Sequence, residues 1–202
     1  MLTNRDLEIL DWINKYKAIS IEQCQILFFK GSYEAARRRL SILEKDKMIK
    51  SYISRASKQK VYYIDKKISD HDLYILDYLK ELKKAGCNIV DIKIKPQYLN
   101  GVMIADAFVK FKFYKYTFNT ILEVDFQHPT EEIKINTLYE KLAKEIDNYE
   151  EFNGRSFILV VAKPLVQNIY NSKNFDTVYT DLKFTNLANF LGLNELIDTN
   201  AL

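Results

Sequence analysis

Residues 32–46 have the sequence SYEAARRRLSILEKD, and this stretch decides the interpretation of the front part of the chain. At about 100° per residue, Ala36, Leu40 and Leu43 fall within one narrow stripe, as in a helix with one buried face. The opposite side of that helix carries the polar residues Arg37, Arg38, Ser41 and Lys45. A helix with cations on its outer face, reached through a tight turn, suits the major groove of duplex DNA.

Two further helices are predicted before this stretch. Thr3 and Asp6 form a capping pair that opens a helix over about residues 4–16. Ser20 and Gln23 form a second capping box, and the helix that they open ends at Gly31, because glycine accepts a left-handed conformation. Ser32 then caps the third helix, which we expect over residues 33–46.

A hairpin is predicted after the third helix. Two β-prone runs, residues 49–54 and 59–64, are joined by the sequence RASK. Three helices followed by a hairpin with a basic tip is the order of a winged helix-turn-helix, whose hairpin lays cations along DNA phosphates. The predicted DNA-binding residues are Ser32, Tyr33, Arg37, Arg38, Ser41, Arg55, Lys58 and Lys60.

The charge of the chain divides in the same place. Residues 1–68 carry 15 Lys/Arg and 8 Asp/Glu, a net charge of +7, whereas residues 69–202 carry 15 and 19, a net charge of −4. We therefore expect a DNA-binding domain over residues 1–68 and a second domain over residues 69–202. A winged helix that contacts proteins in place of DNA is the alternative interpretation.

The rear part is expected to be a small α/β domain, so the predicted fold class is α+β. Residues 70–85 have a leucine spacing typical of a helix, and residues 89–95 alternate as a half-buried strand does. The other predicted elements are strands over residues 102–112, 117–126, 156–162 and 177–179, a long helix over residues 130–149, and a short helix over residues 187–196.

Three carboxylates in the predicted sheet are candidate site residues. Asp106 lies in one strand, and Glu123 and Asp125 lie two residues apart in the next, so the latter two share a face. Like charges on a buried face repel each other unless a cation lies between them. Oxygen ligands suit Mg²⁺ or Mn²⁺, so these three residues are the candidate metal ligands. A solvated strand face is the alternative.

Two resemblances rest on these features. The order helix–three strands–helix–strand, with Asp106 and then Glu123 one strand later, resembles the PD-(D/E)xK nuclease core. The whole chain resembles the replication-relaxation family of plasmids, phages and conjugative elements. The matching stretches are LSILEKDKMI (residues 40–49), IADA (104–107) and LEVD (122–125). The resemblance implies binding of double-stranded DNA in replication, DNA relaxation or transfer of a mobile element, with replication or transfer proteins as partners.

The chain departs from the nuclease motif at two positions. Ala105 stands where the motif has proline, and Asp125 stands where it has the lysine that stabilises developing negative charge. A cation from the following helix, Lys134, Lys141 or Lys144, is the expected substitute. Three functions therefore stay open: a DNA-binding protein with an inactive nuclease-like domain, a metal-dependent endonuclease with Asp106, Glu123 and Asp125 as catalytic residues, and a protein-interaction adaptor.

Other patterns limit the function classes. No phosphate-binding glycine loop is present, which disfavours an NTP-driven enzyme. Cys24 and Cys87 form no disulfide framework, and the chain lacks a signal core and a membrane-length apolar run, so we expect a cytoplasmic protein with no membrane partner, which could be a homodimer. Residues 108–118 interleave aromatics with lysines, as in a surface that stacks single-stranded bases or in a strand with edge lysines.

Overall fold

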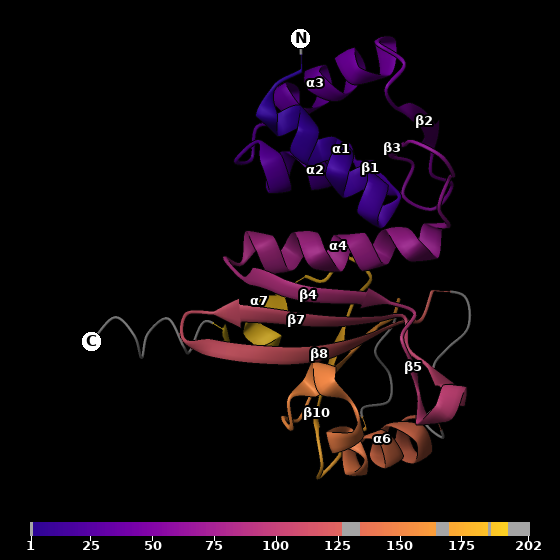
Figure 1. The fold of residues 1–202 in the computed structure, drawn as a ribbon, viewed down its shortest axis with the longest axis vertical. Coiled ribbons are helices and arrows are strands. Elements are labelled where there is room, and N and C mark those ends of the chain that lie inside the picture. The colour runs from indigo at the N-terminus through magenta and orange to yellow at the C-terminus, as the bar shows by residue number, and fades with distance from the viewer. Residues whose placement is uncertain (1, 127–133, 165–169, 186, 194–202) are drawn as a thin grey trace. The chain divides into compact units, whose positions relative to one another are not determined.

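A computed structural model describes residues 2–126, 134–164, 170–185 and 187–193 (Figure 1). The protein is a mixed α+β protein with two compact units, Met1–Lys84 and Ala85–Leu202. Within the described residues, no helix has the length and apolar character needed to cross a membrane.

The first unit contains four helices and three short strands. Its elements are α1 (Asn4–Tyr16), β1 (Ala18–Ser20), α2 (Ile21–Phe28), α3 (Tyr33–Lys45), β2 (Lys50–Ile53), β3 (Lys60–Tyr63) and α4 (Asp70–Lys84). Both expected capping boxes are present, at Thr3 with Asp6 and at Ser20 with Gln23. Ser32 is the N-cap residue of α3, but its side chain makes no capping hydrogen bond.

The three strands form an antiparallel sheet with the order β1-β3-β2. One hydrophobic core joins the sheet to the first three helices. Its buried members are Ile9, Ile13, Ile19, Cys24, Ala36, Leu40, Leu43, Ile49 and Tyr62. The inner stripe of α3 is thus the predicted one, and its burial fixes which side chains of α3 face outward.

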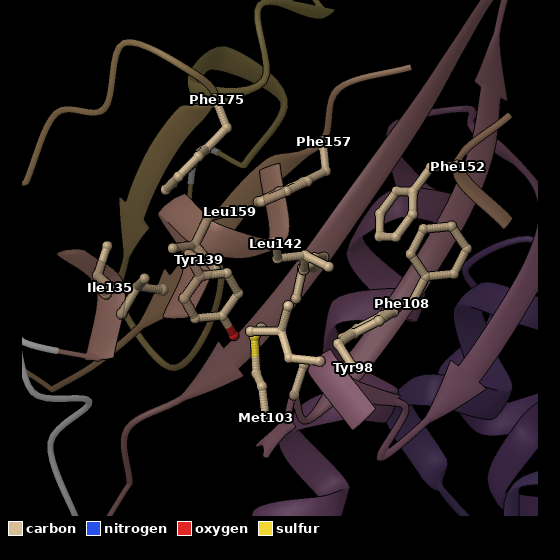
Figure 2. Close-up of a cluster of buried hydrophobic side chains, with 14 residues drawn as sticks. Tyr98, Met103, Phe108, Ile135, Tyr139, Leu142, Phe152, Phe157, Leu159 and Phe175 are labelled. Carbon is tan, nitrogen blue, oxygen red and sulfur yellow. The ribbon is translucent and has the colours of Figure 1, made fainter. Parts of the chain in front are cut away.

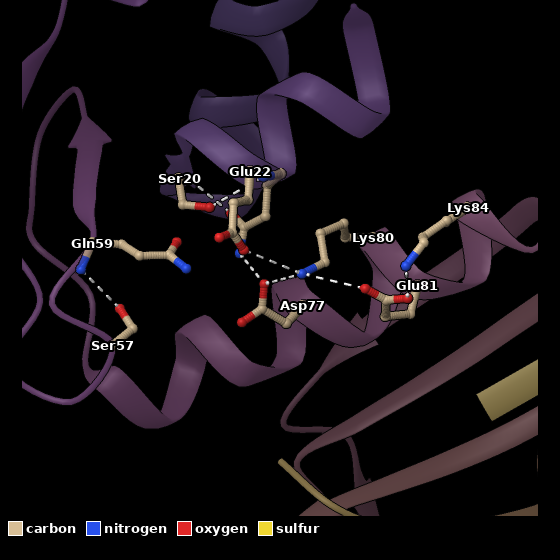
Figure 3. Close-up of polar contacts among 9 residues, drawn as sticks. Ser20, Glu22, Ser57, Gln59, Asp77, Lys80, Glu81 and Lys84 are labelled. Carbon is tan, nitrogen blue, oxygen red and sulfur yellow. Dashed lines mark hydrogen bonds and ion pairs between the residues drawn. The ribbon is translucent and has the colours of Figure 1, made fainter. Parts of the chain in front are cut away.

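The boundary between the units differs from the expected one after residue 68, because α4 belongs to the first unit. Lys80 on α4 lies 3.8 Å from a Glu22 carboxylate oxygen on α2 and 3.3 Å from an Asp77 oxygen on its own helix (Figure 3). Gln23 on α2 donates a hydrogen bond to Asp77 at 3.1 Å. These polar contacts tie α4 to α2 and extend the first unit to Lys84.

The second unit is built around a sheet. Its elements are β4 (Asn88–Ile94), β5 (Gln97–Tyr98), η1 (Leu99–Gly101), β6 (Met103–Ile104), β7 (Ala107–Phe113), β8 (Tyr116–Val124), η2 (Ile135–Tyr139), α6 (Glu140–Lys144), η3 (Ile146–Asn148), η4 (Glu150–Phe152), β9 (Ile158–Ala162), β10 (Asp176–Thr180) and α7 (Leu187–Phe190). The five-stranded sheet has the order β10-β9-β8-β7-β4 and is mixed. Strands β4, β7 and β8 are antiparallel, whereas β8, β9 and β10 run parallel.

A second hydrophobic core covers one face of this sheet (Figure 2). Side chains from β7, β8 and β9 pack there against Tyr139 and Leu142, which lie on the helical segments after β8. Since Ile121 belongs to this core, Glu123, two residues along β8, points to the same side of the sheet.

Several expected elements of the rear part are shorter or more irregular than predicted. The expected strand over residues 102–112 is divided into β6 and β7, and the stretch between β4 and β6 contains β5 and η1. Of the long helix over residues 130–149, the first four residues lie outside the described range, and the rest is a π-helical turn, a short α-helix and a 3-10 turn. The expected last helix is α7, and residues 194–196 lie outside the described range.

Candidate nucleic-acid interface and carboxylate site

The outer side of α3 lines a shallow surface pocket. Its lining residues are Ser32, Glu34, Ala35, Arg37, Arg38, Ser41, Ile42 and Lys45. Four of the predicted DNA-binding residues are therefore brought together on one surface. Tyr33, at the start of α3, is 43% exposed and is not part of the pocket lining.

The cations of this surface differ in their partners. The Arg37 guanidinium donates to Glu34 at 2.8 Å, and both side chains are exposed. Arg38 and Lys45 make no ion pair with any residue in the described part of the chain. Because an exposed ion pair is held weakly in water, a phosphate can replace Glu34 as the partner of Arg37.

A buried ion pair holds α3 in place. Arg39, beside the outer arginines, donates two hydrogen bonds to the Asp6 carboxylate on α1. The Asp6 side chain is fully buried, which by itself raises its pKa, but hydrogen bonds from Arg39 and Thr3 outweigh burial and lower the pKa to about 2. Arg39 is thus a structural cation that positions the helix.

The tip of the β2–β3 hairpin is tied to α4. The Ser54 hydroxyl donates to one Asp70 carboxylate oxygen at 2.5 Å, and the Ala56 N–H donates to the other at 3.2 Å. Arg55 and Lys58 in the same loop are exposed. The loop therefore presents two cations to solvent, while one carboxylate fixes its backbone.

Lys60, the third cation predicted for the hairpin, has a different position. Its ammonium lies 2.6 Å from a Glu44 carboxylate oxygen on α3, and the Ser51 hydroxyl donates to the other oxygen of Glu44 at 2.5 Å. This contact links the C-terminal end of α3 to both strands of the hairpin. The Lys60–Glu44 pair is less exposed than the Arg37–Glu34 pair, and Glu44 is also held by Ser51, so we do not include Lys60 in the candidate interface.

In the second unit, Glu123 is the most buried of the three candidate carboxylates, with 4% of its surface exposed. Lys134 donates to its Oε1 at 2.7 Å, and the Tyr139 hydroxyl donates to the same oxygen. Burial raises the pKa of Glu123, as does the nearby Asp106 charge, while Lys134 and Tyr139 act in the opposite direction. Lys134 is one of the three lysines expected to replace the motif lysine.

The other two carboxylates are held by the backbone around them. Asp106 lies between β6 and β7, and its Oδ2 accepts the Val124 N–H at 2.8 Å. Asp125 follows β8 directly and is buried, and its N–H donates to the Ala162 carbonyl at 2.8 Å. Among the described residues, which include all three acids, no group of three His, Cys, Asp or Glu side chains is placed to hold a metal ion.

The donor set therefore does not fit the Mg²⁺ or Mn²⁺ site expected from the sequence. One oxygen of Glu123 accepts from Lys134 and Tyr139, and one oxygen of Asp106 accepts the Val124 N–H, so these two atoms are already engaged by protein groups. A hard divalent cation needs several unshared oxygen ligands. The arrangement holds the Glu123 charge in place with protein groups alone.

Tyr139 was not anticipated, and its position follows from an irregular turn. Lys134 and Tyr139 are five residues apart, which places them about 140° apart around a regular α-helix. The chain here forms a π-helical turn over Ile135–Tyr139, in which residues five apart lie on the same side. Helical periodicity carries no signal of such a turn.

Comparison of the chain with protein-family models, with curated proteins and with solved structures gives no match.

Proposed function

We propose that the protein binds double-stranded DNA through its first unit, with α3 in the major groove and the β2–β3 hairpin along the phosphate backbone. The observation that carries this proposal is the surface of α3, where Arg37, Arg38 and Lys45 line one pocket. The element order and the strand order β1-β3-β2 support a winged helix-turn-helix.

The exposed cations suit this partner. Arg55 and Lys58 lie in the hairpin loop, so they can contact phosphates while α3 meets the bases. The first unit, taken to Lys84, carries 18 Lys/Arg and 12 Asp/Glu, whereas the second carries 12 and 15. A polyanion is therefore attracted to the first unit.

The proposal is tested by fluorescence anisotropy with labelled duplex DNA and the full chain. Replacing Arg37 and Arg38 with Ala should weaken binding at least about tenfold, because two cations that face the groove are removed. The matched control is Lys83→Ala with Lys84→Ala, which removes the same charge from α4. Equal duplex DNA affinities of these two double variants would refute the assignment of α3 as the helix that contacts DNA.

The biological setting that we infer is the replication, relaxation or transfer of a mobile element, or its regulation. This inference is supported by the short stretches LSILEKDKMI, IADA and LEVD together with the α/β unit that follows the first unit. Within that setting, the second unit adds contacts with a replication or transfer protein, with a second copy of the chain, or with DNA.

A metal-dependent endonuclease is the second candidate function, and one observation favours it. Lys134 forms an ion pair with Glu123, which supports the idea that it substitutes for the motif lysine. Because no three acids among the described residues are placed to hold a metal ion, and Glu123 is paired with Lys134, we favour an inactive nuclease-like unit. Incubation of supercoiled DNA with Mg²⁺, with Mn²⁺ and with EDTA decides between the two. Metal-dependent nicking that disappears in Glu123→Gln would establish the enzyme.

A further inference from the structure

The tip of the β7–β8 hairpin in the second unit carries exposed aromatic side chains. The strands pair up to Phe113 and Tyr116, and the two residues between them form the turn. Tyr114 is 59% exposed and Tyr116 is 37% exposed, and Lys115 between them is also exposed. Large aromatics gathered on an exposed turn need an explanation, because burial is their usual contribution to a fold.

Packing beneath the tip supports these rings. Phe111 and Phe118 stack across the two strands, with ring centroids 5.1 Å apart. Phe113 is buried, and its ring meets that of Tyr114 at 87° with centroids 4.9 Å apart. The Tyr114 ring therefore rests on a fixed neighbour while much of its surface stays open to a ligand.

The backbone at Tyr114 is in the left-handed region, with φ of 51°. Glycine and asparagine adopt this conformation at low cost, and a bulky aromatic residue does so at a higher cost. Tyrosine is therefore unfavourable for the backbone conformation of this turn, while its position at the tip exposes the aromatic ring to solvent. Such a local conflict is typical of positions that serve a function.

The charge around the tip is positive. Lys112 and Lys115 are exposed, and no acidic residue occurs between Lys110 and Leu122. The Lys115 ammonium lies 5.5 Å from the centroid of the Tyr116 ring, so a cation and an aromatic ring are presented together. Phosphates attract the lysines, and unstacked bases can lie on the tyrosine rings.

We propose that the β7–β8 tip is a binding site for single-stranded DNA, in which Tyr114 and Tyr116 stack on bases and Lys112 and Lys115 contact phosphates. A duplex does not fit this site, because its bases are already stacked and offer no open faces at the groove. The site lies in the second unit, so it does not rest on duplex binding by α3.

The test uses the full chain, labelled oligothymidylate and the variant Tyr114→Gly. Glycine suits the positive φ, so we expect an unchanged or higher melting temperature. Loss of the ring should weaken oligothymidylate binding at least about fivefold, since stacking of one base contributes that much. Lower affinity together with retained stability separates a binding role from a structural one.

Two further arms complete the experiment. Lys112→Gln with Lys115→Gln should flatten the salt dependence of binding, by about 0.7 for each phosphate that the variant no longer neutralises, whereas Tyr114→Gly should leave that slope unchanged. The effect of Tyr114→Gly should persist when Arg37 and Arg38 are replaced by Ala. Absence of oligothymidylate binding, an equal loss of duplex binding in Tyr114→Gly, or an equal loss of binding to phosphatidylserine vesicles would overturn the proposal.

Discussion

Two of the buried carboxylates among the described residues are held by side-chain partners. Asp6 is held by Arg39 and Thr3 in the first unit, and Glu123 is held by Lys134 and Tyr139 in the second. A buried charge is tolerated only when such partners are present, so removal of one partner has a large effect.

Asp6 gives the first unit a predictable response to acid. Its carboxyl has a pKa of about 2 in the folded chain and 3.8 as the ordinary value, so its contribution is fully present only above about pH 5 and is lost as the pH falls towards 2. As the pH falls from about 4 to 2, the free energy of unfolding should decrease by about 1–2 kcal/mol. Trp12, the single tryptophan, packs on Tyr16 in this unit and reports the transition by fluorescence.

The variant Asp6→Asn tests that origin of the acid sensitivity. It should be less stable than the wild type at neutral pH, and its stability should change less between pH 4 and pH 2. Asp11→Asn, on the exposed side of α1, is the matched control. An Asp6→Asn variant with the pH dependence of the wild type would contradict this assignment.

Lys134 should matter more to stability than other lysines of its helical segment. Lys134→Ala leaves the Glu123 carboxylate buried without its cation, which should cost about 2–4 kcal/mol. Glu123→Gln in the same background should recover part of this loss, because no buried charge remains. Urea unfolding followed by circular dichroism measures both. The control is Lys141→Ala, which removes an exposed lysine. A loss of stability in Lys134→Ala no larger than that in Lys141→Ala would contradict the prediction.

Among the elements, the β2–β3 hairpin combines a structural acid with exposed cations. Asp70 accepts two hydrogen bonds that fix the loop, and its negative charge is bonded to the loop that carries Arg55 and Lys58. Asp70→Asn removes the charge and keeps an acceptor oxygen, so duplex DNA affinity should rise about two- to fourfold. Asp70→Ala removes both bonds and should lower the affinity by loosening the loop. Anisotropy titrations that show the same direction for both variants would contradict this account.

The sequence predicts the helices of the first unit well because local chemistry sets their ends. Capping boxes at Thr3 and Ser20 fix where α1 and α2 begin, and the apolar stripe of α3 fixes its buried face. Strand β1 was not predicted, because three residues are too short to show an alternating pattern.

The ion-pair partners of individual charged residues were harder to predict from the sequence than the helices and strands. The sequence shows that Lys60 and Arg37 are cations, but their pairing with Glu44 and Glu34 depends on side-chain geometry. In the carboxylate site, Lys134 was one of three lysines expected near Glu123, whereas Tyr139 reaches it only through a π-helical turn. Both cases need the tertiary structure.

At the scale of the whole molecule, the two units differ in charge and in core. The first has a net formal charge of +6 and the second −3, with the division after Lys84. Each unit buries its own hydrophobic cluster. The basic unit with an exposed cationic helix is the part suited to duplex DNA, and the acidic unit offers a separate, locally basic hairpin tip.

The salt dependence of duplex DNA binding by the full chain tests the central claim most directly. Arg37, Arg38, Lys45, Arg55 and Lys58 are the exposed cations of the proposed interface. If each of these five cations contacts one phosphate, the slope of log affinity against log salt concentration should be roughly −4 to −5. If Arg37 and Arg38 contact bases, the slope should be correspondingly shallower. Replacing Lys45, Arg55 and Lys58 with Gln should reduce the slope by about 3. No duplex binding at low salt, or a slope that these substitutions leave unchanged, would contradict the proposal.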